Sequence, residues 1–377
     1  LCGINSGAVD TSYARANVDT ELIVSGGGIA AVNEGYISNS YFVIDSFEEE
    51  ISGTKKKAAE LQSRTAAAMQ KNPLFKEWAV GACWTAGTLK ETNFMPVFAK
   101  NISSPEYSDG DGTAQSPYIV KNERDLYNIR FNKSAHYKIV NDIAYSGNWS
   151  GIGDMPEPFT GTVDGNHHTV TFAGVNGTAE NCGFIGYGEN CTVKNLNIAA
   201  SVAAVGNSYT KLKHTGMIIA YGKNVNIENC LFNGSITVSA EYAYTGAIAG
   251  DVTGTIKGCR SYGTLSVTGD IASGHSASGG IAGRIDGNIS ASESRVNISI
   301  NGIAYDGLSE TGGLCGIITG TVDNSCYSGT ITDSSANEKT YAGGLSGTAE
   351  GDILTSYSDA EIISSGENDG SVSGKIY

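Results

Sequence analysis

Four carboxylates that lie close together in the sequence are the first candidates for chemistry. Asp142, Asp154, Glu157 and Asp164 occur in the contexts NDI, GDM, PEP and VDG. An enzyme that cleaves glycosidic bonds needs two carboxyl groups about 5 to 9.5 Å apart on either side of the bond. Asp beside Gly or Asn is typical of tight turns, so most of these four residues are expected to be turn residues. A converging catalytic set remains the alternative.

Histidine offers little metal chemistry in this pattern. His167 and His168 are neighbours, and adjacent residues of a strand point to opposite faces. We therefore expect this pair to flank a surface turn and not to bind metal. The zinc-peptidase motif HExxH, the nucleophile motif GxSxG and a phosphate-binding P-loop are absent from the sequence. No catalytic residue, metal or cofactor is predicted. The five histidines are His136, His167, His168, His214 and His275.

The segment Asp109-Gly110-Asp111-Gly112-Thr113 resembles half of a calcium-binding loop. A full loop of that kind has a bidentate Glu at its twelfth position. Counting from Asp109, that position is Val120. The segment is therefore expected to be a plain Asp-Gly turn.

The elements that would position these residues form a repeat. A fixed period between 20 and 50 residues indicates a solenoid, a propeller or an array. Each repeat holds three short segments rich in Ile, Val, Thr and Leu, separated by Gly, Asn, Asp and Ser, a pattern typical of strands. The repeats begin at glycine-rich anchors whose first glycines, by subtraction of their numbers, are 30 to 33 residues apart: Gly183, Gly216, Gly246, Gly279, Gly312 and Gly343.

Three strands and no helix per repeat favour an all-β parallel β-helix, or β-solenoid. Its rungs would stack at about 4.8 Å. Propeller blades need about 40 residues and four strands, so they fit less well. Ile248, Ile281, Leu314 and Leu345 are expected to stack in the core of the solenoid, with short helical segments as caps.

The chain is expected to contain parts of two repeat units. Residues 1–104 would be the end of a first unit with its closing cap, in which a short helix follows Thr65 and stops near Pro73. Residues 105–377 would be a second unit, with a leading module over 105–180 and regular rungs over 181–377. The first residues lack the basic start and apolar centre of a signal peptide, so targeting signals are expected outside this sequence.

The leading module should contain one short amphipathic helix. Asn122 is a plausible N-cap, and Leu126 and Ile129 would share its apolar face.

Cysteine placement favours free thiols. Cys230 and Cys259 each lie three residues after an Ile, and other rungs have Ser292 and Ser325 in the same position. A Cys that interchanges with Ser reads as a small buried side chain. A disulfide between Cys230 and Cys259 stays open, because adjacent rungs could bring their Cα atoms within bonding range. Eight cysteines are present in all.

Tyrosines show two regularities. One set follows the Cys/Ser position at short offsets and is expected to stack as a ladder: Tyr13, Tyr41, Tyr262, Tyr327 and Tyr357. A second set lies in the variable segments before the anchors, where insertions map to one edge of a solenoid. Such tyrosines could bind a glycan or a protein, although they could equally fold back over the solenoid. This set is Tyr209, Tyr242, Tyr244, Tyr305 and Tyr341.

Composition excludes several classes of partner. The net charge is −15, which is unfavourable for binding nucleic acid or anionic lipid. No apolar run approaches the roughly 20 residues of a membrane-spanning helix, so no membrane insertion is expected. Few charges and much Gly suit a secreted or surface-exposed β-protein.

The rungs over roughly 1–45 and 183–363 resemble the GLUG-motif repeats of bacterial surface and adhesin-like proteins. The segment from Asp111 to Phe172 is similar to the module that precedes such repeats, and TAAAMQKNPLF…W is similar to the piece that follows them. In that family the repeats also precede the protease domain of some immunoglobulin-A-cleaving metallopeptidases. The resemblance implies a right-handed parallel β-helix displayed outside the cell, without enzyme activity of its own.

These observations together predict a non-catalytic bacterial β-helix protein, located at the cell surface or secreted. An adhesin-like role, with a host or environmental glycan or an extracellular protein as partner, is the leading interpretation. A structural stalk that projects another domain and a carbohydrate-active β-helix enzyme are the alternatives.

Overall fold

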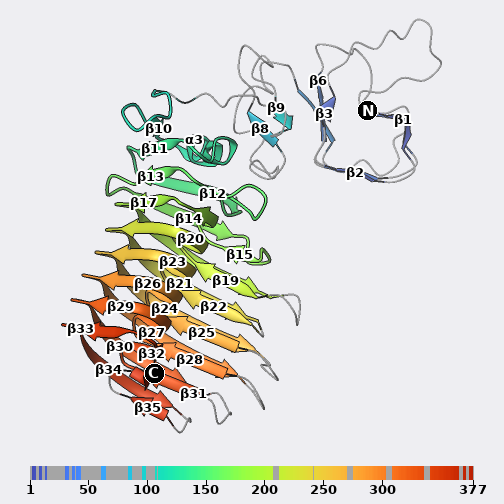
Figure 1. Cartoon of the computed structure of the whole chain (residues 1–377). Helices are drawn as coiled ribbons and strands as arrows, with labels where there is room; N and C mark the ends of the chain where they lie inside the picture. The colour runs from blue at the N-terminus through green and yellow to red at the C-terminus, as the bar shows by residue number, and fades with distance from the viewer. Residues whose placement is uncertain are drawn as a thin grey trace, which may run out of the picture. The chain divides into compact units, whose positions relative to one another are not determined.

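The computed structural model describes residue 107 and residues 109–206, 212–240, 242–269, 275–302, 308–334, 340–364, 368–370 and 373–376, together with short strands between Cys2 and Phe98. The chain divides into two compact units, Leu1–Glu106 and Tyr107–Tyr377 (Figure 1).

In the first unit the strands β1 to β7 pair in parallel, and β8 pairs with β9 antiparallel. The helix predicted after Thr65 lies outside the described residues. The bounds are β1 Cys2–Asn5, β2 Ala8–Asp10, β3 Tyr13–Ala14, β4 Ala30–Asn33, β5 Tyr36–Ser38, β6 Ser40–Val43, β7 Leu61–Arg64, β8 Trp84–Ala86 and β9 Pro96–Phe98.

The second unit is a parallel β-solenoid built from three long sheets, as the repeat predicted (Figure 1). The first sheet contains β10 Tyr118–Val120, β11 His136–Ile139, β13 Thr162–Asp164, β17 Thr192–Lys194, β20 Ile219–Glu228, β23 Ala249–Lys257, β26 Ala282–Ser290, β29 Cys315–Asp323, β32 Ser346–Ala349 and β36 Ser373–Ile376, with β16 Ile185–Glu189 and β33 Asp352–Leu354 pairing at its side.

The second and third sheets complete each rung. The second sheet contains β12 Ile143–Trp149, β14 Thr169–Val175, β18 Asn197–Val205, β21 Leu231–Ser239, β24 Arg260–Gly269, β27 Glu293–Gly302, β30 Cys326–Asp333 and β34 Tyr357–Ser364. The third sheet contains β15 Asn181–Cys182, β19 Lys213–Gly216, β22 Ala243–Gly246, β25 His275–Gly279, β28 Leu308–Gly312, β31 Thr340–Gly343 and β35 Asn368–Gly370. The third sheet thus begins at Asn181.

One rung runs from the third sheet to the first and then to the second, as in β25, β26 and β27. The anchor glycines stay in register from rung to rung, so that Gly246 lies opposite Gly279 and Gly279 opposite Gly312. The sequence period is therefore the rung period, which confirms the predicted β-solenoid.

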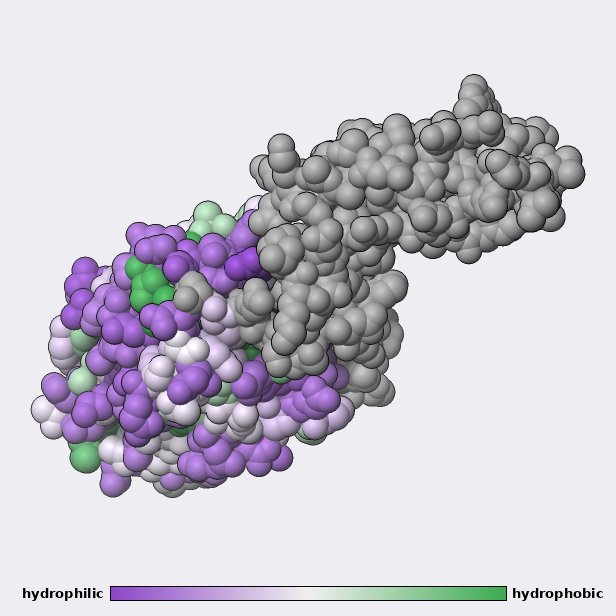
Figure 2. Space-filling model, turned by 90° about the horizontal axis from the view of Figure 1, so that it is seen from above, coloured by the Kyte–Doolittle hydropathy of each residue, from purple (hydrophilic) through white to green (hydrophobic). Residues whose placement is uncertain are grey.

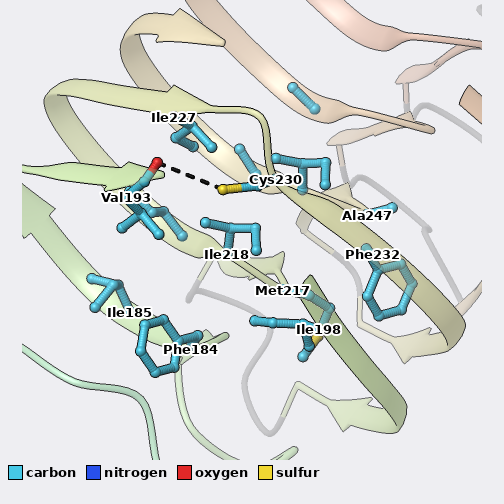
Figure 3. Close-up of a cluster of buried hydrophobic side chains, with 14 of the residues drawn as sticks. Phe184, Ile185, Val193, Ile198, Met217, Ile218, Ile227, Cys230, Phe232 and Ala247 are labelled. Carbon is cyan, nitrogen blue, oxygen red and sulfur yellow. Dashed lines mark hydrogen bonds between the residues drawn. The ribbon is translucent and has the colours of Figure 1, made fainter. Parts of the chain in front are cut away.

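The core lies between the sheets and contains aliphatic residues stacked one rung above another, together with aromatic residues such as Trp149 and Phe184. Ile248, Ile281, Leu314 and Leu345 are fully buried. The backbone N–H of Ile281 donates to the Leu314 carbonyl at 2.8 Å, and that of Leu314 donates to Leu345 at 2.9 Å. Figure 3 shows the same stacking nearer the N-terminal end, where Ile218 lies among Ile185, Val193 and Ile227. The predicted core ladder is confirmed.

The anchor glycines allow the third sheet to approach the first. A Cβ added to Gly279 would lie 2.2 Å from the Ala282 carbonyl oxygen and 2.5 Å from the Cα of Cys315. Both atoms belong to the backbone and cannot rotate away. Glycine is therefore required here for close approach of neighbouring strands.

The corner between the first and second sheets explains why Cys and Ser share one position of the repeat. Cys230, Cys259, Ser292 and Ser325 occupy this Cys/Ser position. The residue before it has a left-handed backbone in several rungs, for example Asn229 at φ 51° and Asn324 at φ 45°. The next residue turns inward. Ser292 Oγ donates to the Ser290 carbonyl at 2.9 Å and accepts from the Cys259 N–H at 3.1 Å. The six described cysteines are free thiols, as predicted: Cys182, Cys191, Cys230, Cys259, Cys315 and Cys326.

A short helix covers the N-terminal end of the second unit (Figure 1). This helix, α3 (Glu123–Asn128), continues into the 3-10 turn η4 (Ile129–Phe131). Asn122 Oδ1 accepts the Asp125 N–H at 3.0 Å, and Leu126 and Ile129 are fully buried. The predicted N-cap and apolar face are confirmed, and the helix acts as a cap over the first rung.

The predicted tyrosine ladder is wrong for the second unit, whereas in the first unit Tyr13 lies in register with Tyr41. Tyr327 is fully buried, whereas Tyr357 is 64% exposed and lies opposite Cys326. Tyr262 is opposite Arg295. The three residues occupy different positions of the strand.

The surface seen in Figure 2 is mainly hydrophilic outside the grey region. Among the described residues, no helix combines the length and apolarity that a membrane-spanning helix requires. The exposed large apolar residues are Met155, Val205, Leu354, Tyr357 and Ile363.

Candidate binding strip

The third sheet carries the described members of the predicted tyrosine set. Tyr244 lies in β22 and Tyr341 in β31, and Tyr242 directly precedes β22. All three are half-buried. Tyr209 and Tyr305 lie outside the described residues. The structure therefore gives positions for three of the five candidates.

Tyr244 and Tyr341 occupy the same position of their strands. In the register of the third sheet, five residues lie opposite one another on successive strands, in the order His214, Tyr244, Ala277, Glu310 and Tyr341. One line of side chains thus crosses five strands of the third sheet.

A second line crosses the first sheet beside it. In the register of this sheet, four residues lie opposite one another on successive strands, in the order Tyr187, Tyr221, Asp251 and Arg284. The two lines meet through side-chain contacts of His214 and Tyr244, described below. We call the following eight side chains the strip: Tyr187, His214, Tyr221, Tyr244, Asp251, His275, Arg284 and Glu310.

Ring contacts run through the strip. The rings of Tyr187 and Tyr221 stack with centroids 5.2 Å apart, and those of Tyr221 and His214 stack at 4.7 Å. Tyr244 meets His214 at 6.2 Å and the ring of His275 edge-on at 5.5 Å. Aromatic pairs at such distances are favourable beyond their buried area, so the rings hold one another in place.

Ion pairs connect neighbouring rungs of the strip. Arg284 Nε donates to Asp251 Oδ1 at 2.8 Å, and the guanidinium lies over the Tyr244 ring with its carbon 5.5 Å from the centroid. His275 Nε2 lies 2.5 Å from Glu310 Oε2. Asp251 and Glu310 are buried. Burial raises the pKa of the Asp251 carboxyl, while Arg284 opposes this effect.

His214 is the buried base of the strip. Its Nδ1 lies 2.8 Å from Asn181 Oδ1, which can only accept, so Nδ1 carries the proton. Its Nε2 is 3.8 Å from Asp251 Oδ2 and makes no hydrogen bond among the described residues. Burial lowers the pKa of His214 to about 4, with contributions from Arg284 and Lys213. His214 is therefore neutral at neutral pH.

The strip presents aromatic rings and one guanidinium to the outside. Tyr221, Tyr244, His275 and Arg284 are half-buried, and each carboxylate is engaged by a basic side chain of an adjacent rung. Rings with polar tips can stack on a sugar or anchor a protein partner. This arrangement is suited to binding.

Most of the strip was absent from the sequence-based candidates. Tyr187, Tyr221, Asp251 and Arg284 each directly follow the last residue of an anchor, which is the signal that could have revealed them. His214 and Glu310 lie in the segments before the anchors, where only tyrosines were considered.

In the leading module Asp154 and Glu157 form a turn, as predicted, whereas Asp142 directly precedes β12 and Asp164 is the last residue of β13. Asp142 Oδ1 accepts from the Thr169 N–H at 2.9 Å, and Asp154 Oδ1 accepts from the Glu157 N–H at 3.0 Å. Glu157 also pairs with Lys133 at 2.6 Å.

Asp164 ends strand β13, and its Oδ1 accepts from the Asn166 N–H in the following turn and from Asn195 Nδ2. Each of the four carboxylates thus has a structural partner within the leading module or the next rung.

The remaining polar candidates also lie in turns. His167 has a left-handed backbone at φ 65°, and His168 Nδ1 lies 3.2 Å from Asp142. Asp111 Oδ1 accepts from the N–H and the hydroxyl of Thr113, which lowers the pKa of its carboxyl. Within the described ranges, no group of three His, Cys, Asp or Glu side chains could hold a metal ion.

Comparison with known proteins supports the fold and gives sparse information on function. No protein-family model matches the chain. A solved structure described as "a putative immunoglobulin A1 protease from Bacteroides ovatus" superposes with a TM-score of 0.52 and 19% identity, over 71% of this chain and 86% of that one. At that identity the likeness concerns the fold alone.

Two relatives match parts of the chain. "Putative Gly-rich membrane protein" of Evansella cellulosilytica is 30% identical over 113 residues, which are 27% of this chain and 13% of that protein. "Halomucin" of Haloquadratum walsbyi is 37% identical over 105 residues, which are 24% of this chain and 1% of that protein. The chain therefore spans a small part of the length of these relatives.

Proposed function

We propose that this chain is a non-catalytic β-solenoid displayed at the surface of a bacterial cell or secreted from it, where it binds a glycan in an adhesin-like manner. The observation that carries the proposal is the strip, in which partly exposed rings and polar groups line up across successive rungs. The names of the two partial relatives, a membrane protein and a mucin, support an extracellular location.

A line of side chains suits a long ligand. Successive rungs of a parallel sheet are about 4.8 Å apart, so Tyr221 and Arg284, two rungs apart, are separated by about 10 Å along the stack. A polymer lying along the strip would contact several rungs at once. Each contact would contribute modestly, and the sum would set the affinity.

The strip is also largely preformed. Its rings contact one another, and its ion pairs join neighbouring strands of a packed solenoid. Little side-chain entropy remains to be lost when a ligand binds.

The test is a polysaccharide and glycan binding screen of the chain, followed by Tyr221→Ala with Tyr244→Ala in one variant. We expect binding to fall by about tenfold or more, because two stacking surfaces are removed. The matched control is Tyr262→Ala, a half-buried tyrosine of the second sheet outside the strip. Circular dichroism checks that each variant is folded.

Two results would contradict the proposal. Binding that survives in the folded double variant would place the site elsewhere, and the variant Tyr242→Ala, Tyr244→Ala, Tyr305→Ala would then test the predicted loop edge. A chain that binds nothing in a broad screen would favour the structural stalk.

A further inference from the structure

We infer that the strip recognises an acidic saccharide, and that Arg284 is the residue that binds its carboxylate. The inference rests on the proposed function, because it names the ligand class of the same site. It is carried by the way in which Arg284 is held and by the groups that surround it.

Arg284 is anchored on one edge of its guanidinium. The Nε–H donates to Asp251 Oδ1 at 2.8 Å, and the Asp251 side chain is 5% exposed. The Arg284 side chain is 42% exposed, and its Nη groups have no hydrogen-bond partner among the described residues. The donors that remain are the planar pair that matches a carboxylate with two parallel hydrogen bonds.

Surrounding groups hold this edge in place. The guanidinium carbon of Arg284 lies over the Tyr244 ring, 5.5 Å from its centroid. Arg284 in β26 is also the register partner of Asp251 in β23, so the pairing of these strands holds the two residues side by side. A donor fork that is already oriented loses little entropy when an anion binds. Arg284 is thus prepared for a ligand carboxylate on the side away from Asp251.

Aromatic neighbours supply the saccharide part of the recognition. Tyr244 lies against Arg284, and Tyr221 lies two rungs away in the same line. A sugar unit could stack on a tyrosine while its carboxylate reaches Arg284. A neutral sugar would leave the Nη donors without an acid partner.

The other charges of the strip do not compete for this role. Glu310 is within 2.5 Å of His275, and Asp251 is the partner of Arg284 itself. The chain as a whole carries a net charge of −15, which opposes unspecific adsorption of a polyanion. Binding of an acidic polymer would therefore depend on a local receptor, and Arg284 can be tested as that receptor.

The experiment measures binding of the intact chain to soluble polygalacturonate, alginate and hyaluronate, each compared with its methyl ester and with a neutral glucan. We expect at least one free acid to bind about tenfold more tightly than its ester, because esterification removes the charge-assisted hydrogen bonds. Arg284→Lys keeps the charge but not the fork, and should lose most of this preference.

A second variant removes Arg284 without leaving its buried partner unpaired, so that loss of binding cannot be explained by misfolding. Asp251→Asn combined with Arg284→Gln removes both charges together, so no buried carboxylate is left unpaired. It should also lose the preference for the free acid while keeping the Tyr221- and Tyr244-dependent binding. The matched control is Arg295→Gln on the second sheet, whose Nε lies 2.5 Å from Glu293.

The outcomes separate this inference from the proposed function. Strip-dependent binding that is equal for acid, ester and neutral glucan would overturn the inference and leave the glycan-binding function standing. Equal losses in Arg284→Lys and Arg295→Gln would also overturn it, since general charge attraction would then explain the binding. If the chain bound none of these polymers and no glycan in the screen, both the inference and the proposed glycan-binding function would be wrong.

Discussion

Asp251 and Arg284 lie opposite each other on adjacent rungs and form a 2.8 Å hydrogen-bonded ion pair, with the carboxylate buried and the guanidinium half-exposed. The pair joins β23 to β26 beside the anchor glycines. It links the stability of the solenoid to the chemistry of the strip.

Arg284→Gln should destabilise the chain, because it leaves a buried carboxylate without its partner. Breaking a fully buried pair costs about 3–5 kcal/mol, and the exposure of Arg284 reduces the expected loss to about 2 kcal/mol. Urea unfolding measures this loss. Adding Asp251→Asn should restore part of it; a double variant as unstable as the sum of the single ones would show that the two residues do not interact.

Stability should fall as the pH is lowered from about 6.5 to about 4, in part because of His214. Its pKa is lowered to about 4 by burial, so the unfolded chain binds a proton in this window that the folded chain does not. The shift corresponds to about 3 kcal/mol at most. His214→Gln should flatten the dependence of unfolding free energy on pH. An unchanged slope in His214→Gln would contradict the assignment.

Gly279→Ala should be severely destabilising, on the order of 3 kcal/mol or more. The new methyl group would lie within 2.5 Å of two backbone atoms, Ala282 O and Cys315 Cα. Gly174→Ala is the matched control, since its nearest contact is an Asn148 side-chain atom at 3.4 Å. Thermal unfolding compares the two. Similar melting temperatures would show that the anchor glycines are not needed for close approach.

Replacing Ile281 tests the core ladder. Ile281→Ala should cost about 2–5 kcal/mol because it leaves a cavity between rungs. Ile281→Asp should prevent folding, because it buries an unpaired charge. Ile363 is 53% exposed, so Ile363→Ala should change stability by no more than about 0.5 kcal/mol. Denaturant unfolding with equal losses at the two sites would argue against the stacked core.

Cys259→Ser should cost less than about 1 kcal/mol, with or without a reducing agent, because serine already occupies this position in the next rung. There Ser292 Oγ donates to a carbonyl of its own corner at 2.9 Å, the contact that Cys259 Sγ makes with Lys257 O at 3.5 Å. A large loss under oxidising conditions alone would reveal a disulfide with Cys230.

Local and periodic features were predictable from the sequence. The spacing of the anchors predicted the rungs, because a parallel solenoid places the same residue type in register at every turn, as with Gly279 and Gly312. Asn122 and the buried residues Leu126 and Ile129 were also predicted, because helix capping and amphipathicity act within a few residues. The same reasoning gave a turn role to Asp154, whose Oδ1 accepts from the Glu157 N–H.

Features that depend on a one-residue offset were not predictable in the same way. Tyr327 and Tyr357 follow the Cys/Ser position at offsets that differ by one, and the side chains of a strand alternate between faces. One residue is therefore buried and the other exposed, so the expected ladder does not exist.

The meeting of the two lines that form the strip was decided by tertiary structure alone. His214, Tyr244 and Arg284 are far apart in the sequence and meet because glycine anchors let the third sheet pack closely on the first. The period of the sequence determined which residues share a line along each sheet. It carried no information about which two lines would come together, because that depends on the angle and distance at which the sheets pack.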